Sequence, residues 1–363
     1  MGLALGGGHG LLEGHYGLAA DQIISARIVL ANGTLVTASA TSNIDLYWAI
    51  KGAGHNFGVV TLLQYKIYDV PATDLWTYES FIYTQDKLEA LYTAINTLTA
   101  NGTQPAGLMN FSAYTRMAAI DPVNVGLAPP FFPFPKSNAY MQTALTSYLQ
   151  LQPVIIFFIF FQGTAAQEAV HAVPFHALGP VIVQAGNCTY PELPTILGIG
   201  VSDAVCAHGL TWQRFPISLQ SYSTTAQRDV FTAFSVLTET YPALNGSSYI
   251  FEGYSVAGVK AVPDASTAYP YRQDNLLVSP FMSYAPNATL DPIVAAFGNA
   301  TRAILHRYSG SLELHAYVNY AHGDETLQQL YGYDPWRQTK LQALKKLYDP
   351  MGYFDFYAPI SRS

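Results

Sequence analysis

The motifs of this chain are concentrated at its two ends. Residues 52–61 read GAGHNFGVVT, and residues 316–360 run from AYVNYAHG to YDPMGYFDFYAPI. The long stretch between these segments carries no chemical motif of comparable density. Two distant segments of this kind predict a domain built from both chain ends, with a second domain inserted between them. At 363 residues the chain is long enough for two domains of ordinary size.

The chain carries few charges. Lys, Arg, Asp and Glu make up 11% of the residues, the formal net charge is −7, and the basic residues are scattered. A nucleic-acid partner requires a basic stripe that neutralises phosphates, so this class of function is set aside. The longest apolar run, residues 154–161 (VIIFFIFF), is far shorter than the ~20 residues that span a bilayer. It predicts a buried strand.

Seven Asn-x-Ser/Thr sequons predict a secreted glycoprotein in which sugars replace surface charge. They begin at Asn32, Asn101, Asn110, Asn187, Asn245, Asn287 and Asn299. The alternative interpretation is coincidence in a Thr-rich sequence. Cys188 and Cys206 are compatible with one disulfide in that compartment. The first residues carry no basic n-region and no apolar h-region, so either the protein is cytosolic or Met1 is not the natural start.

Hydrophobic patterning predicts an α+β fold with antiparallel strands covered by helices. The expected strands lie at 23–29, 33–38, 57–68, 109–115, 153–161, 248–254, 275–284 and 312–320. The expected helices lie at 45–51, after Asp86, around 230–241, from Asp291 and from Asp334. In the last helix, Leu341 and Leu347 are expected inward and Arg337 and Lys345 outward. A loop rich in Pro and Phe is expected at 127–136.

Two glycine clusters are candidate ligand-binding segments. They comprise Gly6, Gly7, Gly8 and Gly10 in the first, and Gly52, Gly54 and Gly58 in the second. Glycine lets backbone N–H groups approach phosphates or a flat ring because no Cβ intervenes. Neither cluster fits a Rossmann fingerprint or a P-loop. Without further context, ordinary turn glycines are the better interpretation.

Nucleophilic and metal-assisted catalysis have little support in the sequence. The segment GYSVAG at 253–258 departs by one residue from an esterase elbow. No HExxH motif occurs, and the nine histidines are interpreted as structural. No metal site is predicted.

The segment YVNY at 317–320 is a candidate catalytic strand. In a strand, Tyr320 would share a face with Val318, and Tyr317 would share the other face with Asn319. A phenol acts as a general base only if its pKa of ~10 is lowered by placement or by a partner. A packed aromatic strand is the alternative interpretation, and spacing alone favours it.

The motifs taken together resemble those of the berberine-bridge-enzyme-like flavoprotein oxidases, the FAD-linked superfamily with a PCMH-type FAD-binding domain. The resemblance rests on GGGHGLLEGHYGLAADQIISARIVLANG, SNIDLYWAIKGAGHNFGVVT, YVNYAHG and YDPMGYFDFYAPI, in this order. It is strongest to the fungal secreted branch that includes carbohydrate oxidases. It implies that residues 1–72 form the C-terminal part of the FAD-binding domain, 73–310 the substrate-binding domain, and 311–363 a berberine-bridge-like segment that returns to the FAD domain. Members of the family have many residues ahead of the segment that corresponds to residue 1 here. The chain is therefore expected to be an N-terminally incomplete member that lacks the segment with the covalent link to the flavin.

The resemblance implies FAD as cofactor, hydride transfer from an alcohol C–H to flavin N5, and O2 as electron acceptor with H2O2 as product. Tyr320, the second tyrosine of the Y-x-N-Y motif, is the implied base, and Glu252 is the assisting carboxylate. The implied FAD contacts are Gly6, Gly7, Gly8, Gly54, Asn56, Gly58, Val60 and Asn319. The implied substrate is a small molecule, with carbohydrates among the candidates. Its identity is open, because fold does not fix substrate. The alternative is a non-catalytic remnant or a secreted ligand-binding protein without flavin.

Overall fold

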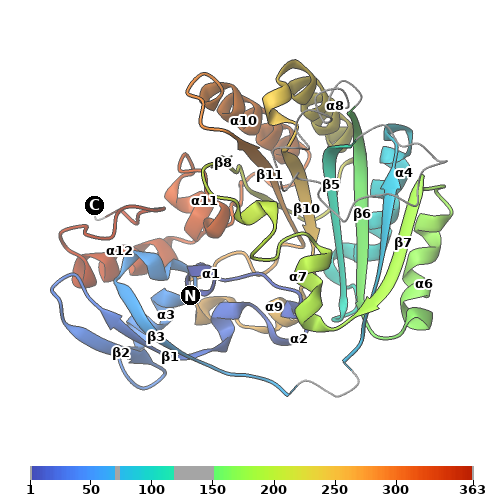
Figure 1. Ribbon diagram of the computed structural model, residues 1–363. Helices are drawn as coiled ribbons and strands as arrows, with labels where there is room; N and C mark the ends of the chain where they lie inside the picture. Colours follow the sequence, from blue (N-terminus) through green and yellow to red (C-terminus); the bar gives the residue numbers. More distant parts are fainter. Residues whose placement is uncertain (1, 70–73, 118–150, 362–363) are drawn as a thin grey trace.

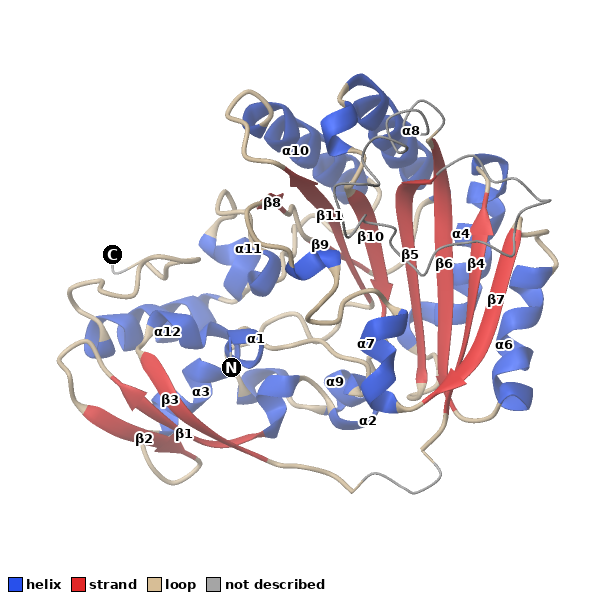
Figure 2. Cartoon of the chain, in the orientation of Figure 1, coloured by secondary structure: helices blue, strands red, loops and turns tan. Residues whose placement is uncertain are grey.

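The computed structural model describes residues 2–69, 74–117 and 151–361. Two antiparallel sheets with attached helices make up the described chain, which confirms the predicted α+β class (Figure 1). The smaller sheet comes from residues 23–65 and the larger one from residues 76–284, and Figure 2 shows the two as separate groups of strands. The division into three parts at residues 72 and 310 stays a prediction.

The smaller sheet has three strands in the order β2-β1-β3. Their bounds are β1 Ile23–Val29, β2 Leu35–Ser39 and β3 Val59–Tyr65. Helix α3 (Ile44–Ala53) packs with this sheet, and so do Leu341 and Leu344 of helix α12 (Pro335–Tyr348). Residues from both ends of the chain therefore share one hydrophobic core.

The larger sheet has eight strands in the order β7-β4-β6-β5-β10-β11-β8, with β9 paired to β11. Their bounds are β4 Trp76–Tyr83, β5 Leu108–Met117, β6 Gln152–Gln162, β7 Ile182–Cys188, β8 Thr211–Gln213, β9 Ile217–Leu219, β10 Ser248–Gly253 and β11 Leu276–Tyr284. The apolar run at 154–161 lies within β6 and is buried except at Phe161, as the sequence predicted.

Four long helices cover one face of the larger sheet (Figure 1). They are α4 Leu88–Thr99, α6 Ala165–His176, α8 Thr224–Thr240 and α10 Asp291–Arg307. The predicted apolar stripes are buried here, with Leu88, Val230 and Phe234 each fully covered. A second cluster, which includes Phe111 and Leu193, covers the other face of the sheet.

The remaining helical segments are short. The α-helices are α1 Gly2–Leu5, α2 Glu13–Tyr16, α7 Leu193–Ile196, α9 Ala257–Ala261 and α11 Leu327–Tyr331. The 3-10 segments are Ala19–Gln22, Gly54–Asn56, Gln85–Lys87, Ala100–Gly102, Tyr190–Glu192, Ala204–Cys206, Pro242–Leu244, Asp264–Ser266 and Val318–Tyr320. None of the described helices has the length and apolarity that a membrane span requires.

The predicted strand at 312–320 is wrong. Its backbone makes single hydrogen bonds to two different neighbours, because the His315 carbonyl accepts from Ser218 and the Ala316 N–H donates to Gln329. No ladder forms with one partner strand, and the segment ends in the 3-10 turn Val318–Tyr320. With about three residues per turn, Tyr317 and Tyr320 lie on the same side rather than on opposite faces.

Two side chains of α12 that were predicted to point outward are buried. Arg337 and Lys345 are each fully covered, whereas Leu347, predicted inward, is 64% exposed. Arg337 pairs with Asp264, and Lys345 pairs with Asp349 at 2.7 Å. These partners compensate the cost of burying charge, and helical periodicity gives no sign of them.

Two predictions about surface chemistry also need correction. Cys188 and Cys206 are both free thiols, the first buried and the second exposed, so they form no disulfide with each other. The sequon at Asn110 lies inside β5 with its side chain 1% exposed, so a glycan cannot occupy it in the folded protein. Secretion stays a prediction. The expected loop at 127–136 lies outside the described residues.

Candidate active site

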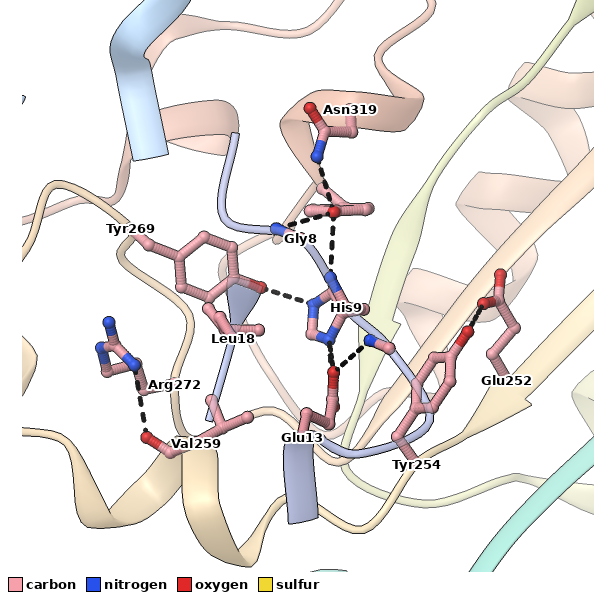
Figure 3. Close-up of polar contacts among 12 residues, drawn as sticks. Gly8, His9, Glu13, Leu18, Glu252, Tyr254, Val259, Tyr269, Arg272 and Asn319 are labelled. Carbon is pink, nitrogen blue, oxygen red and sulfur yellow. Dashed lines mark hydrogen bonds and ion pairs between the residues drawn. The ribbon is translucent and has the colours of Figure 1, made fainter. Parts of the chain in front are cut away.

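The two predicted catalytic residues are hydrogen-bonded to each other. Tyr320, on the 3-10 turn, donates from Oη to Oε1 of Glu252 on β10 over 3.0 Å. Tyr254 donates to the other carboxylate oxygen over 2.5 Å, as Figure 3 shows. The Glu252 side chain is 5% exposed. A buried carboxylate is thus held between two phenols, and the catalytic roles of Tyr320 and Glu252 stay predictions.

The electrostatics of Tyr320 differ from the sequence expectation. Burial raises the pKa of its phenol well above the ordinary value of 10.0, and the Glu252 charge raises it further. The Arg214 guanidinium acts in the opposite direction but does not reverse the shift. Tyr320 therefore keeps its proton and serves as a hydrogen-bond donor, which leaves the Glu252 carboxylate as the proton acceptor of the pair.

A cavity of about 120 Å³, partly open to solvent, adjoins this pair. Its walls come from β5, β8, β10, β11 and the segment around residues 197–205. Arg214 also lines it, with the guanidinium 3.9 Å from the Tyr320 ring centroid and 4.5 Å from that of Phe281. The sequence analysis missed Arg214 because a single basic residue beside a short strand has no distinguishing pattern.

The first glycine cluster lies against the Tyr317–Tyr320 segment. The N–H groups of Gly8 and His9 both donate to the Tyr317 hydroxyl, at 3.1 and 3.2 Å. At Gly6, a Cβ would stand 2.1 Å from the Asn319 side-chain oxygen, so only glycine allows this approach. The glycine-rich head and the tyrosine-bearing tail therefore meet in space.

Asn319 fixes this contact. Its side-chain nitrogen donates to the Tyr317 hydroxyl at 2.6 Å and to the Leu3 carbonyl at 2.8 Å. The Tyr317 ring in turn meets the Tyr320 ring edge-on, with centroids 5.1 Å apart. Both amide hydrogens of Asn319 are thus used inside the chain, and within the described structure the residue positions the turn that carries Tyr320.

His9 occupies the centre of a buried polar cluster (Figure 3). Its Nδ1 lies 2.9 Å from Glu13, and its Nε2 lies 2.9 Å from the Tyr269 hydroxyl. Burial disfavours the charged ring, but the Glu13 carboxylate outweighs burial, and the pKa of His9 is raised. The ring also stacks on Tyr254 at a centroid distance of 5.9 Å. Both ring nitrogens are partnered, which agrees with the structural interpretation of the histidines.

The second glycine cluster is packed against the chain itself. A Cβ at Gly54 would meet Leu5, one at Gly58 would meet Ile28, and Val60 packs on the core of the smaller sheet. None of the three is among the residues that line the cavity. Their contact with FAD stays a prediction.

Asn56 is fully buried and joins the C-terminal segment to the rest of the fold. Its side-chain nitrogen donates to Tyr331 at 3.0 Å and to the Ala358 carbonyl at 3.3 Å, while its oxygen accepts from the Ile360 N–H at 3.0 Å. These contacts use the whole amide group. The side chain of Asn56 therefore serves the fold, and the predicted contact of its backbone with FAD stays a prediction.

The loop at residues 6–10 provides no free cradle of N–H groups for a phosphate. Gly6 and Gly7 donate to the carbonyls of α1, Gly8 and His9 to Tyr317, and Gly10 to Glu13. The described residues instead fit the substrate-facing side of a flavin site, where a partnered phenol and carboxylate adjoin a cavity. The predicted contacts of Gly6, Gly7, Gly8 and Asn319 with the flavin stay predictions.

Comparison with known proteins identifies the class. No protein-family model matches the chain. The FAD-linked oxidoreductase chyH of Penicillium rubens is 42% identical over 364 residues, covering 99% of this chain and 67% of that protein. The chain therefore belongs to the FAD-linked oxidoreductases. It spans about two thirds of the length of the curated relatives it matches.

Solved structures show which fold the chain has. The BBE-like 1 protein of Physcomitrella patens matches with a TM-score of 0.69 at 21% identity, over 99% of this chain and 70% of that chain. The xylooligosaccharide oxidase of Myceliophthora thermophila C1, in complex with xylobiose, matches with a TM-score of 0.73 at 21% identity, over 99% and 70%. These matches confirm the predicted resemblance to the berberine-bridge-enzyme-like fold.

Proposed function

We propose that this chain forms the substrate-binding part of an FAD-dependent oxidase that acts on an alcohol carbon of a small molecule, with O2 as electron acceptor and H2O2 as product. Membership of the FAD-linked oxidoreductases supports the redox class. The observation that carries the proposal is the 3.0 Å hydrogen bond between Tyr320 and Glu252, which both line one cavity.

The geometry supports a path for the substrate proton that consists of two linked transfers. A substrate hydroxyl that donates to Tyr320 Oη would lose its proton to the phenol oxygen as the phenol proton moves to Glu252. This path requires no free tyrosinate, which the raised pKa of Tyr320 disfavours. Proton transfer to a positioned group typically contributes about 10²- to 10⁴-fold to the rate. FAD, when bound, supplies the acceptor for the hydride from the carbon that bears this hydroxyl.

The rest of the cluster holds this pair in position. Tyr317 and Asn319 anchor the 3-10 turn to the glycine loop, and Tyr254 occupies the second oxygen of Glu252. With both oxygens of the carboxylate engaged, its orientation toward Tyr320 is fixed. Such preorganisation is what a proton acceptor requires for efficient transfer.

Substitution of Tyr320 tests the proposal. In the flavin-loaded protein, Tyr320→Phe is expected to lower kcat with an alcohol substrate by about 10²-fold or more while the visible flavin spectrum is kept. Tyr308→Phe, which removes a hydroxyl from a 42% exposed ring on the surface, is the matched control. Turnover by Tyr320→Phe within twofold of the control would remove Tyr320 from the mechanism.

A further inference from the structure

The lining of the cavity beside Tyr320 is mainly apolar. The apolar part of the lining, in which only the indole N–H of Trp212 can bond to a hydroxyl, includes Met109, Phe111, Leu197, Trp212, Ile250 and Phe281. The Trp212 ring packs against Phe281, with centroids 4.6 Å apart. These walls favour a flat or branched hydrocarbon surface, because burying apolar area yields about 25 cal/mol per Å².

Polar groups in the lining are few, and most are already engaged. Glu252 accepts from Tyr254 and Tyr320, so its two oxygens are occupied. A sugar exposes a hydroxyl on nearly every carbon, and each one that is buried without a partner weakens binding. Tyr320 and Ser248 can each bond to one hydroxyl, but the lining cannot satisfy the full set that an oligosaccharide presents.

Arg214 is the exception to this apolar lining. Its guanidinium stacks on the rings of Tyr320 and Phe281, yet it makes no ion pair or hydrogen bond with any described residue, and Nη1 is buried without a partner. A guanidinium has five N–H donors that match a carboxylate in a two-pronged arrangement. No described residue provides a carboxylate that pairs with this cation. A ligand that carries a carboxylate can therefore pair with it in the cavity.

We propose that this cavity takes an apolar, ring-bearing alcohol that carries a carboxylate, with the carboxylate on Arg214 and the hydroxyl on Tyr320, rather than an oligosaccharide. The inference rests on the proposed oxidase function for the fate of the hydroxyl, but the binding preference follows from the lining alone. The oligosaccharide oxidase with the same fold does not contradict it, because fold does not fix substrate.

A binding experiment tests the preference without turnover. In calorimetric titration of the flavin-loaded protein, para-methylbenzoate is expected to bind at least tenfold more tightly than its methyl ester. Arg214→Gln should make the affinities for acid and ester equal. An indirect effect on Tyr320 would change both affinities alike and so would leave their ratio unchanged. Arg307→Gln, which removes an exposed positive charge on α10, is the matched control and should keep the ratio. Equal affinity for acid and ester in the unsubstituted protein would overturn the proposal.

A turnover experiment separates this inference from the proposed function. We expect kcat/KM for para-hydroxymethylbenzoate to exceed that for xylobiose at least tenfold. If xylobiose is the better substrate, the oxidase function stands and the substrate class is wrong. If the aromatic acid binds through Arg214 but its hydroxymethyl form never reduces the flavin, the binding class stands and the oxidase function fails.

Discussion

Buried charges in this protein are held by partners from distant parts of the sequence. Lys345 is fully covered, donates to the Asn56 carbonyl at 2.9 Å and pairs with the equally buried Asp349 at 2.7 Å. Burial disfavours the charge of Asp349, but the hydrogen bonds from Lys345 and two backbone N–H groups outweigh burial and lower its pKa below the ordinary value of 3.8. Asp349 is therefore ionised at neutral pH.

Replacing Lys345 should destabilise the fold. Lys345→Met leaves the buried Asp349 carboxylate without its cation, which is expected to lower the free energy of unfolding by about 3 kcal/mol. The stabilisation from the depressed pKa of Asp349 is present above pH ~4 and is lost as the pH falls through its lowered value. Urea denaturation at neutral pH measures the effect, with the exposed Lys346→Met as control. Equal stability of the two variants would contradict this account.

Only part of the site was predictable from residues alone. The Y-x-N-Y motif identified Tyr320, and the structure places Glu252 beside it as expected. Arg214 was not predictable, because its significance comes from the two rings and the cavity that surround it. The direction of the Tyr320 pKa shift was also inaccessible, since it depends on burial by side chains from remote segments.

At the scale of elements, periodicity predicted the helices α4, α8 and α10 and the strands β5, β6, β10 and β11, whose apolar faces pack together. It failed at 312–320, where the backbone forms hydrogen bonds with several neighbouring segments instead of one partner strand. It predicted neither helix α6 nor strands β4 and β7, and so gave no sign that α6 buries an acid against the sheet. Glu168 of α6 is 1% exposed, and the carboxylate of Glu79 on β4 lies beside it.

This pair of acids should make stability depend on pH. Burial, together with the Glu79 charge, raises the pKa of Glu168 from 4.5 to about 8. The folded state therefore holds a proton that the unfolded state releases above pH ~4.5, so the free energy of unfolding should fall as the pH rises from about 4.5 to about 8. Glu168→Gln, which mimics the protonated acid, should flatten this dependence in urea titrations. The exposed control is Glu239→Gln. If the free energy of unfolding of Glu168→Gln falls with pH as steeply as that of the control, the assignment is wrong.

At the scale of the whole molecule, the predicted association of the two chain ends depends on a few polar residues as well as on the shared core. The glycine loop binds Tyr317 across 309 positions of sequence, and Asn56 binds Ile360 across 304. The sequence predicted that the ends meet because motifs of one family occur at both. It could not show that Asn56 joins them through its own side chain rather than through a cofactor.

Removal of the Asn56 amide should therefore loosen the C-terminal segment. Asn56→Ala deletes the bonds to Tyr331, Ala358 and Ile360 and leaves buried partners unsatisfied, for which we expect a loss of about 2–4 kcal/mol in the free energy of unfolding. Limited proteolysis should cut the last residues faster, because the segment is held there by these bonds. Asn32→Ala, in an exposed turn with one local bond, should change neither measurement. If Asn56→Ala leaves the stability of the flavin-free protein unchanged, the structural role of the amide is wrong.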